Sequence, residues 1–287
     1  MKNLPTVNIP KNYNYIACFL TLGCNYKCSY CINRFESQKL KKEIIPGKDW
    51  IKAINRIKSR SDLPITLQGG EPSIHPNFID IINNINPKLK IDILTNLQFN
   101  VEEFIKKVKP KRLWRKAPYA PIRVSYHPGV MDLDQTFEKV LILQNAGFYI
   151  GVWSVLHPSN KKVILLAKKK AEKLNIDFRF KEFLGKYKNK LYGTYRYKNA
   201  CSKKIKKDVL CKTTELIVGP KADIFRCHSD LYESRTPIAN MLDPKFQIKN
   251  NFRLCSWYGH CNPCDIKIKT NRFQKFGHTS VEIKNLK

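Results

Sequence analysis

The sequence lacks any run of eighteen consecutive apolar residues, so we expect no transmembrane helix. Its first fifteen residues contain no apolar core of a secretory signal, and we therefore expect a cytoplasmic protein with no membrane partner. Apolar residues are not scarce, since they make up 43% of the 287 residues and aromatics make up 11%. This composition excludes a disordered chain and allows one large or two medium domains.

Acidic residues are scarce: 23 Asp and Glu stand against 53 Lys and Arg, which gives a formal net charge of +30. Such an excess favours an anionic partner, such as nucleic acid, a phosphorylated metabolite or an anionic polymer. The alternative is a compositional bias of the genome, with the lysines simply solvated. Composition alone leaves both interpretations open.

Cysteine is absent between residues 32 and 200, although the chain has ten cysteines. Because a reducing compartment disfavours structural disulfides, grouped cysteines there more often bind metal. Cys18 lies inside the first predicted strand, and we expect it in the core. The others form an N-terminal group and a C-terminal group: Cys24, Cys28 and Cys31, then Cys201, Cys211, Cys227, Cys255, Cys261 and Cys264.

Short apolar runs alternate with helical patterns through the first two thirds of the chain. The pattern predicts strands at 16–22, 64–68, 91–97, 122–127, 148–156 and 176–183, and helices at 49–60, 75–84, 101–109, 134–145 and 160–174. This alternation predicts an α/β fold with a parallel sheet and right-handed crossovers. Six repeats favour a partial (β/α)6 TIM-like barrel, with its chemistry at the C-terminal ends of the strands.

The pattern changes after about residue 184. Residues 186–207 are basic and rich in tyrosine, and residues 216–227 form a β-like unit around a Gly-Pro turn. The remainder is irregular and rich in cysteine. We therefore expect a core barrel at 1–185 and a small cysteine-rich domain at 186–287.

Cys24, Cys28 and Cys31 form a C-x3-C-x2-C motif directly after the first strand. This spacing also fits one face of a helix, but the motif contains residues that are poor helix formers. A loop there can fold three thiolates around one [4Fe–4S] cluster and leave one iron open to a substrate or cosubstrate. Zinc is the rival, but zinc would need a fourth ligand, and this loop supplies none.

The motif, with the aromatic Tyr30 before its last cysteine, resembles the signature of the radical SAM superfamily. The resemblance implies that S-adenosylmethionine binds the open iron beside Tyr30. It also implies that one electron, from a donor such as flavodoxin or ferredoxin, cleaves this cosubstrate to a 5′-deoxyadenosyl radical. That radical abstracts a hydrogen atom from the substrate. The protein binds and orients the reactants and excludes side reactions.

Two further segments resemble the same family. Gly69-Gly70-Glu71-Pro72, at the end of the second strand, resembles the GGEP motif that holds the methionine amino group. The two glycines would let backbone carbonyls approach an ammonium closely. Ser125, in the fourth strand, resembles a serine that contacts the cosubstrate. The resemblance thus assigns these residues and Tyr30 to cofactor binding.

His127 stands where the family often carries Asp, at the end of the fourth strand. Its imidazole either takes part in substrate chemistry or is only a hydrogen-bonded histidine. His157 and Glu182 also fall near the C-terminal ends of predicted strands, where alternation points some side chains inward. We predict these three as catalytic candidates, one of which could remove a proton from a substrate hydroxyl.

Four of the C-terminal cysteines suit either a tetrahedral zinc ion or a fully ligated [4Fe–4S] cluster, and their spacing does not separate the two. Behind a radical SAM core, this region resembles the twitch domain, a shortened SPASM domain that holds an auxiliary cluster. The resemblance implies a second [4Fe–4S] cluster held by Cys211, Cys227, Cys261 and Cys264. Cys201 and Cys255 are then spare, and either could replace a chosen ligand.

The resemblance does not fix the reaction, because one fold serves many chemistries. Relatives with such a domain act on sugars and cyclitols, on nucleotides, and on peptides. A fully ligated auxiliary cluster that accepts an electron suits a dehydrogenase-type oxidation. We therefore predict an oxidoreductase for a small, polar, anionic substrate, such as a sugar, a cyclitol or a nucleotide-linked molecule.

Two alternatives remain open. One is radical epimerisation or cross-linking of a peptide. The other is an iron–sulfur protein that binds nucleic acid through its basic, tyrosine-rich stretch at 186–207, where bases could stack and phosphates bind. We favour a small molecule over nucleic acid because no RNA-binding module is evident.

Overall fold

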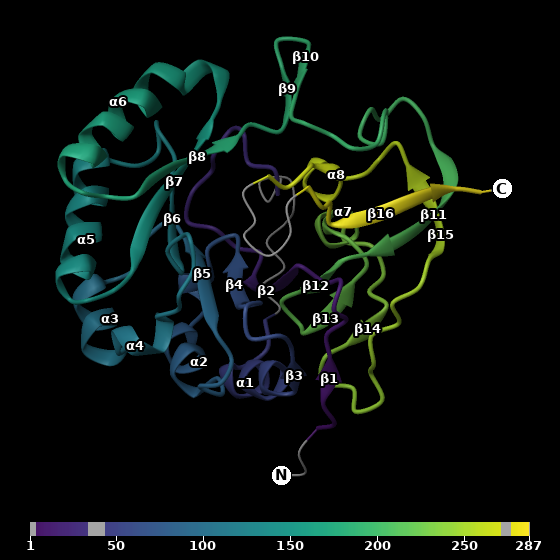
Figure 1. The fold of residues 1–287 in the computed structure, drawn as a ribbon, viewed down its shortest axis with the longest axis horizontal. Coiled ribbons are helices and arrows are strands. Elements are labelled where there is room, and N and C mark those ends of the chain that lie inside the picture. Colours follow the sequence, from purple (N-terminus) through teal and green to yellow (C-terminus); the bar gives the residue numbers. More distant parts are fainter. Residues whose placement is uncertain (1–3, 34–43, 271–276, 287) are drawn as a thin grey trace.

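Nine strands form one mixed sheet in the computed structural model, which describes residues 4–33, 44–270 and 277–286 (Figure 1). Their order in the sheet is β14-β13-β12-β2-β4-β5-β6-β7-β8. The strands are β2 (Tyr15–Thr21), β4 (Ile65–Gly69), β5 (Ile91–Thr95), β6 (Ile122–Tyr126), β7 (Ile150–Leu156), β8 (Phe178–Glu182), β12 (Glu215–Val218), β13 (Asp223–Phe225) and β14 (Ala239–Asn240). All pairs from β2 to β8 are parallel, which confirms the predicted α/β fold and its six parallel strands.

Helices lie along the outer side of these parallel strands (Figure 1). They follow the predicted positions, and a short α4 is added. The helix predicted at 49–60 ends at Asn55, however, and Ile57–Lys58 form the short strand β3 instead. None of the helices in the described ranges is long and apolar enough to span a bilayer. Their bounds are α1 (Gly47–Asn55), α2 (Phe78–Asn84), α3 (Val101–Lys107), α4 (Pro110–Leu113), α5 (Leu133–Asn145) and α6 (Lys161–Lys173), with 3-10 turns η1 (Pro72–Ile74) and η2 (Pro158–Asn160).

Strand alternation decides which side chains face the helices and which face the hollow of the sheet. On β6, Ile122 and Val124 are buried in the main core beneath the helices. Arg123 and Ser125 point the other way and line a cavity. Cys18, on the helix side of β2, is fully buried in the main core, as predicted.

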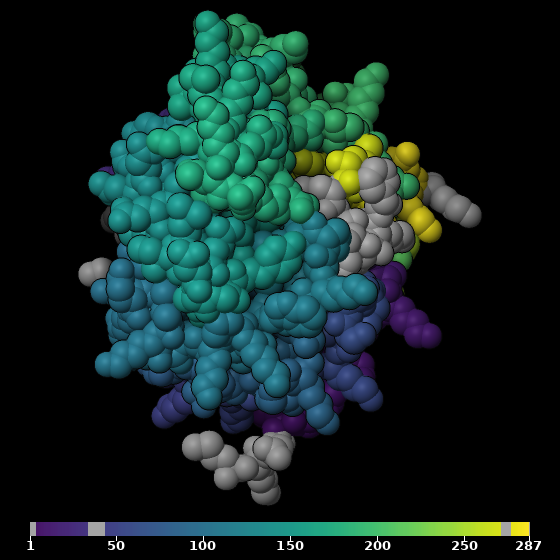
Figure 2. Space-filling view, turned by 60° about the vertical axis from the view of Figure 1, so that its left-hand side comes forward, coloured from purple at the N-terminus to yellow at the C-terminus, as the bar shows by residue number. Residues whose placement is uncertain are grey.

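The C-terminal part of the chain joins the same sheet. The predicted unit at 216–227 is the antiparallel pair β12–β13, but β12 also pairs in parallel with β2. The nine-stranded sheet therefore continues across residue 185, and the division of the chain there stays a prediction. In Figure 2, the C-terminal segments in yellow lie beside the teal and blue segments of the barrel.

Smaller elements complete this part of the chain. Strands β15, β11 and β16 form a second sheet in that order, and β9 and β10 form a hairpin that projects at the top of Figure 1. Strands β1 and β3 pair in parallel in the lower part of Figure 1. The bounds are β1 (Val7–Asn8), β3 (Ile57–Lys58), β9 (Gly185–Tyr187), β10 (Lys190–Tyr192), β11 (Lys207–Thr213), α7 (His228–Tyr232), β15 (Arg253–Tyr258), α8 (Pro263–Ile266) and β16 (Val281–Asn285).

Arg56, the residue after α1, joins distant parts of the chain. Its buried guanidinium donates hydrogen bonds to the carbonyl oxygens of Met241 at 2.6 Å and Asp243 at 2.7 Å. It also donates to Pro5 at 2.7 Å and to Phe246 at 3.3 Å. One cation thus satisfies four backbone acceptors that have no partner in a regular strand or helix.

We expect Arg56→Gln to lower the free energy of unfolding by about 2–4 kcal/mol, because buried carbonyls lose charge-assisted hydrogen bonds. Urea unfolding would measure the change. The control is Lys52→Gln on the exposed side of α1, which should shift the free energy by less than about 0.5 kcal/mol. Equal unfolding midpoints for the two variants would contradict the role of Arg56.

Candidate active site

A cavity of about 710 Å³ occupies the hollow of the parallel sheet and is lined by residues of all six parallel strands. The loop after β2 and residues of α7 and α8 close it from the other side. Barrels of this kind place their ligands at this end of the strands. Most predicted site residues line the cavity: Cys24, Cys28, Tyr30, Cys31, Gly69, Gly70, Glu71, Ser125, His127, Glu182 and Cys264.

The remaining predicted site residues lie outside the cavity wall: Pro72, His157, Cys211, Cys227 and Cys261. Pro72 is buried at the start of η1, directly after Glu71. The structure thus brings most of the predicted cosubstrate residues together in one cavity. Three of the four predicted auxiliary ligands lie outside its wall.

The cysteine loop has no helix between residues 22 and 33, as predicted. Cys28 is buried, and Cys24 and Cys31 are half-buried against the cavity. A donor set made of thiols alone fits an iron–sulfur cluster, whose irons are held by cysteine thiolates. Within the described ranges, no three Cys, His, Asp or Glu side chains are grouped so as to hold a single metal ion. The ligand assignment therefore stays a prediction from donor chemistry and loop position.

Gly69 and Gly70 lie against the backbone of the cysteine loop. A Cβ on Gly69 would stand 2.2 Å from the carbonyl oxygen of Thr21, and one on Gly70 would stand 2.0 Å from that of Gly23. The amide of Gly70 donates to the Thr21 carbonyl at 3.0 Å, and the amide of Glu71 donates to the Gly23 carbonyl at 2.8 Å. The two glycines are thus needed because the backbone of the cysteine loop lies too close for any side chain. This requirement adds to the predicted one, that backbone carbonyls approach an ammonium closely.

Glu71 fastens the ends of two strands together with its buried carboxylate. The carboxylate accepts hydrogen bonds from the Thr95 hydroxyl at 2.7 Å, the Asn96 amide at 2.6 Å and the Ser73 amide at 3.1 Å. Burial raises the pKa of the Glu71 carboxyl, although these hydrogen bonds oppose the shift. Glu71 therefore acts as a positioning residue, whose carboxylate is hydrogen-bonded to neighbouring protein groups.

Asn96 was missed by the sequence analysis. Its side-chain amide donates to the Asn25 side chain at 2.6 Å, which links the end of β5 to the cysteine loop. Asn96 also lines the cavity, as does Thr95. Their place at the C-terminal end of a predicted strand was the signal that could have found them.

Tyr30 contacts two of the catalytic candidates. Its hydroxyl lies 3.1 Å from Nδ1 of His127, and its ring stacks on the His157 ring with centroids 5.0 Å apart. Burial, with the positive charge of Lys181, lowers the pKa of His127 to about 4. The His127 imidazole is therefore neutral at neutral pH and faces the cavity.

The other two catalytic candidates have protein partners. His157 packs edge-on against Phe183 with ring centroids 4.5 Å apart, and its Nδ1 lies 2.7 Å from the Ser159 hydroxyl. Glu182 accepts a hydrogen bond from Thr194 at 2.9 Å and pairs with Lys267 at 3.2 Å. Of the two candidates that line the cavity, His127 is less exposed than Glu182, and the catalytic assignments stay predictions.

The second cysteine group surrounds a small apolar cluster. Cys211, Cys227 and Cys261 each pack against this cluster, and so does the spare Cys201. Burial raises the pKa of the Cys211 thiol to about 12, and the neighbouring Cys255 adds to that shift. Both spare cysteines therefore lie near the predicted auxiliary ligands.

Cys264 differs from the other C-terminal cysteines because it lines the large cavity. The Lys269 ammonium donates to its backbone carbonyl at 3.0 Å. Cys264 thus stands at the boundary between the second cysteine group and the candidate active site, and its ligand role stays a prediction.

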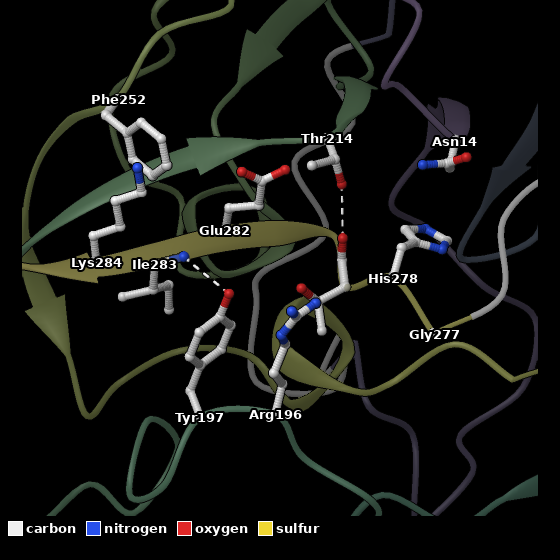
Figure 3. A pocket seen from close by; sticks show the side chains of 11 residues that line it. Asn14, Arg196, Tyr197, Thr214, Phe252, Gly277, His278, Glu282, Ile283 and Lys284 are labelled. Atoms are coloured by element: carbon white, nitrogen blue, oxygen red, sulfur yellow. Dashed lines mark hydrogen bonds between the residues drawn. The ribbon is translucent and has the colours of Figure 1, made fainter.

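A second cavity, of about 510 Å³, lies beside β11 and β16 (Figure 3). In its wall the Tyr197 hydroxyl accepts from the Ile283 amide at 3.0 Å, and the Thr214 hydroxyl donates to the Thr279 carbonyl at 2.7 Å. None of the residues that line this cavity is a predicted site residue. The larger cavity is therefore the candidate active site.

A family model described as "Radical SAM superfamily" matches residues 19–152, the segment that contains the cysteine loop, the Gly69–Pro72 motif and Ser125. Residues 19–152 of this chain form a radical SAM domain. The match confirms the predicted resemblance, and the family implies a [4Fe–4S] cluster and S-adenosylmethionine as cofactors.

Two curated proteins show the range of relatives. GTP 3',8-cyclase of Mannheimia succiniciproducens is 26% identical over 137 residues, which are 44% of this chain and 39% of that protein. The 7-carboxy-7-deazaguanine synthase of Clostridium acetobutylicum is 28% identical over 86 residues, which are 29% of this chain and 38% of that protein. The chain thus spans less than two fifths of the length of these two relatives.

Solved structures share the fold over nearly the whole chain. The structure described as "Native anSMEcpe with bound AdoMet and Kp18Cys peptide" has a TM-score of 0.57 and 13% sequence identity, and the match covers 98% of this chain and 93% of that one. The match extends over the cysteine-rich C-terminal region of this chain. At this level of identity it concerns the fold alone.

We expect Gly70→Ala to displace the cysteine loop, because the added Cβ would collide with the Gly23 carbonyl. Anaerobically reconstituted variant should lose a large part of the roughly four irons of one cubane, and should bind S-adenosylmethionine at least about tenfold more weakly. Iron analysis and calorimetry would measure both. Leu166→Ala, at an exposed position of α6 outside the cavity wall, is the control. Normal iron and normal affinity in Gly70→Ala would show that the loop tolerates the contact.

We expect the parent protein to hold about eight irons, four in each of two cubanes. Replacing Cys24, Cys28 and Cys31 together by Ala should remove about half of them and abolish cleavage of S-adenosylmethionine. Cys255→Ala should keep the full iron content if the predicted four auxiliary ligands are right. Loss of about four irons in Cys255→Ala would make Cys255 a ligand, and stoichiometric zinc would make the second site structural.

Proposed function

We propose that this enzyme reductively cleaves S-adenosylmethionine and removes a hydrogen atom from a small, polar, anionic substrate. The observation that carries the proposal is that the cysteine loop, the Gly69–Glu71 segment and a cationic wall meet in one cavity. Bound there, the cluster and cosubstrate supply a 5′-deoxyadenosyl radical, and an auxiliary cluster supplies an electron acceptor. Cys24, Cys28 and Cys31 would hold the first cluster. The second would be held by Cys211, Cys227, Cys261 and Cys264.

The charge of the cavity wall supports an anionic substrate. Its lining contains two acidic side chains, Glu71 and Glu182, and the first is hydrogen-bonded while the second is paired with Lys267. Such a positive surface raises the local concentration of anions. Six basic side chains line it: Lys27, Arg123, Arg179, Lys181, Lys267 and Lys269.

The net reaction is an oxidation by two electrons, in which the substrate loses a hydrogen atom, a proton and an electron. Neutral His127 is the group in the cavity that can accept the proton. With its Nδ1–H donating to the Tyr30 hydroxyl oxygen, 3.1 Å away, Nε2 would be the basic nitrogen that is left for the substrate. Gly69, Gly70 and Ser125 would hold the cosubstrate, and a donor such as flavodoxin or ferredoxin would supply the priming electron. Cytoplasmic location belongs to the same proposal.

The names of the curated relatives suggest which substrates to try. GTP 3',8-cyclase and 7-carboxy-7-deazaguanine synthase are both named for purine-type molecules. We therefore place purine nucleotides and nucleotide-linked sugars first among the anionic substrates, followed by sugar and cyclitol phosphates.

A second candidate function is radical epimerisation. It is favoured by Cys264, whose place in the cavity wall would let a free thiol return a hydrogen atom to a substrate radical. The product would then carry solvent deuterium at the reacting carbon, whereas a dehydrogenase product would carry none there. Deuterium at that carbon, lost in Cys264→Ser, would replace oxidation by epimerisation.

Anaerobic, reduced protein should form 5′-deoxyadenosine, and the correct anionic substrate should raise its rate. His127→Gln should keep uncoupled formation of 5′-deoxyadenosine within about twofold but lose product formation by about 10²–10⁴-fold, the range of general base catalysis. His260→Gln, a histidine outside the cavity wall, is the control. Full turnover in His127→Gln would remove this residue from the reaction, and a parent that forms no 5′-deoxyadenosine would overturn the proposed function.

A further inference from the structure

Arg123 lines the cavity from the first half of β6, on the same side of the strand as Ser125. His127 directly follows the end of β6, four positions after Arg123, and at about 3.3 Å per residue the two lie roughly 13 Å apart along the chain. Its side chain is 12% exposed, and this exposed part belongs to the cavity wall. Arg123 is thus at the floor, away from the Tyr30–His127 contact beside the cysteine loop.

At this floor, one carboxylate accepts hydrogen bonds from two guanidinium groups. Asp92 accepts from Nε of Arg115 at 2.6 Å and from its Nη2 at 2.8 Å, a bidentate pair. Arg123 reaches the same carboxylate only through Nη2, at 3.2 Å. Two guanidinium groups thus share one carboxylate, and the three buried side chains have a formal net charge of +1. A net positive charge in a buried site favours an anionic ligand.

The Arg123 guanidinium also keeps a hydrogen-bond donor without an acceptor. Its Nε is fully buried and has no hydrogen-bond partner among the described residues. The Tyr119 ring lies beneath the guanidinium at 5.1 Å and holds its plane by a cation–π contact. Because Nε is sealed off from the cavity, a ligand would contact the exposed part of the guanidinium side chain that lines the cavity wall.

Other cations of the cavity already have acceptors. Arg179 donates to Asp177 at 2.9 Å and to the Pro118 carbonyl at 2.6 Å. Lys267 pairs with Glu182, and Lys269 donates to the Cys264 carbonyl. Arg123 differs from these three because its one carboxylate partner, Asp92, already makes a bidentate pair with Arg115.

We propose that Arg123 binds the carboxylate or phosphate group of the substrate at the floor of the cavity. The inference rests on the proposed function and adds where the charge of the substrate is held. A guanidinium presents several N–H donors in one plane and matches the oxygens of such a group. With its anionic group held there, the rest of the substrate would extend toward His127. Its reacting carbon would then lie near the cosubstrate residues.

The test uses calorimetry on anaerobic, cluster-loaded protein saturated with S-adenosylmethionine. The probes are inorganic pyrophosphate and succinate, which separate a phosphate site from a carboxylate site. The parent should bind at least one of them, and Arg123→Gln should bind it at least about tenfold more weakly, as expected for loss of a bidentate charged contact. Arg123→Lys keeps the charge without the planar donors and should lie between the two.

Arg179→Gln is the matched control, because it removes an equal charge that Asp177 already neutralises. It should weaken probe binding by less than about threefold, since its charge is already paired. Arg123→Gln should fold, because the bidentate Arg115–Asp92 pair remains. Its iron content and affinity for S-adenosylmethionine should be unchanged.

Three results would overturn the inference: no binding of either probe to the parent, undiminished binding to Arg123→Gln, or an equal loss in Arg179→Gln. Lost affinity for S-adenosylmethionine in Arg123→Gln, with iron intact, would also overturn it by assigning Arg123 to the cosubstrate. Failure of the proposed function has a different signature. The parent would then form no 5′-deoxyadenosine, while probe binding and its dependence on Arg123 would persist.

Discussion

A close contact between two backbones supports the whole candidate site. The end of β4 lies against the start of the cysteine loop, where the amides of Gly70 and Glu71 donate to carbonyls of that loop. No side chain fits between them, because a Cβ on either glycine would fall within 2.2 Å of a carbonyl oxygen. The Glu71 carboxylate then fastens the end of β5 to the same place. Loop, glycine turn and strand end therefore hold their positions together.

The C-terminal part of the chain completes the site because it pairs with the same strand that carries the cysteine loop. Strand β12 lies parallel to β2, and α7 follows the β12–β13 hairpin toward the cavity. Asp265 of α8 accepts hydrogen bonds from the amides of His228 and Ser229 of α7, each at 2.9 Å. This joins the second cysteine group to the cavity wall, where an electron acceptor would be useful for the proposed oxidation.

Much of the fold was predictable because its signals are local. Apolar runs of strand length alternate with amphipathic helices, and the structure places the six parallel strands within a few residues of the predicted ranges. The cysteine loop and the Gly69–Pro72 motif were also predictable, since each is a short stretch at the end of a strand. The ion group of Asp92, Arg115 and Arg123 was missed, because its members come from separate segments with no common spacing.

The sequence by itself determined the family, the α/β alternation and the loop that can hold a cluster, because these depend on residues that are close together in the chain. Tertiary structure alone decided that β12 adds to the core sheet, since a short apolar strand does not specify its partner. It also decided that Cys264 faces the cavity while Cys201 and Cys255 lie beside the other C-terminal cysteines. Such placements depend on how distant segments pack, which no local pattern encodes.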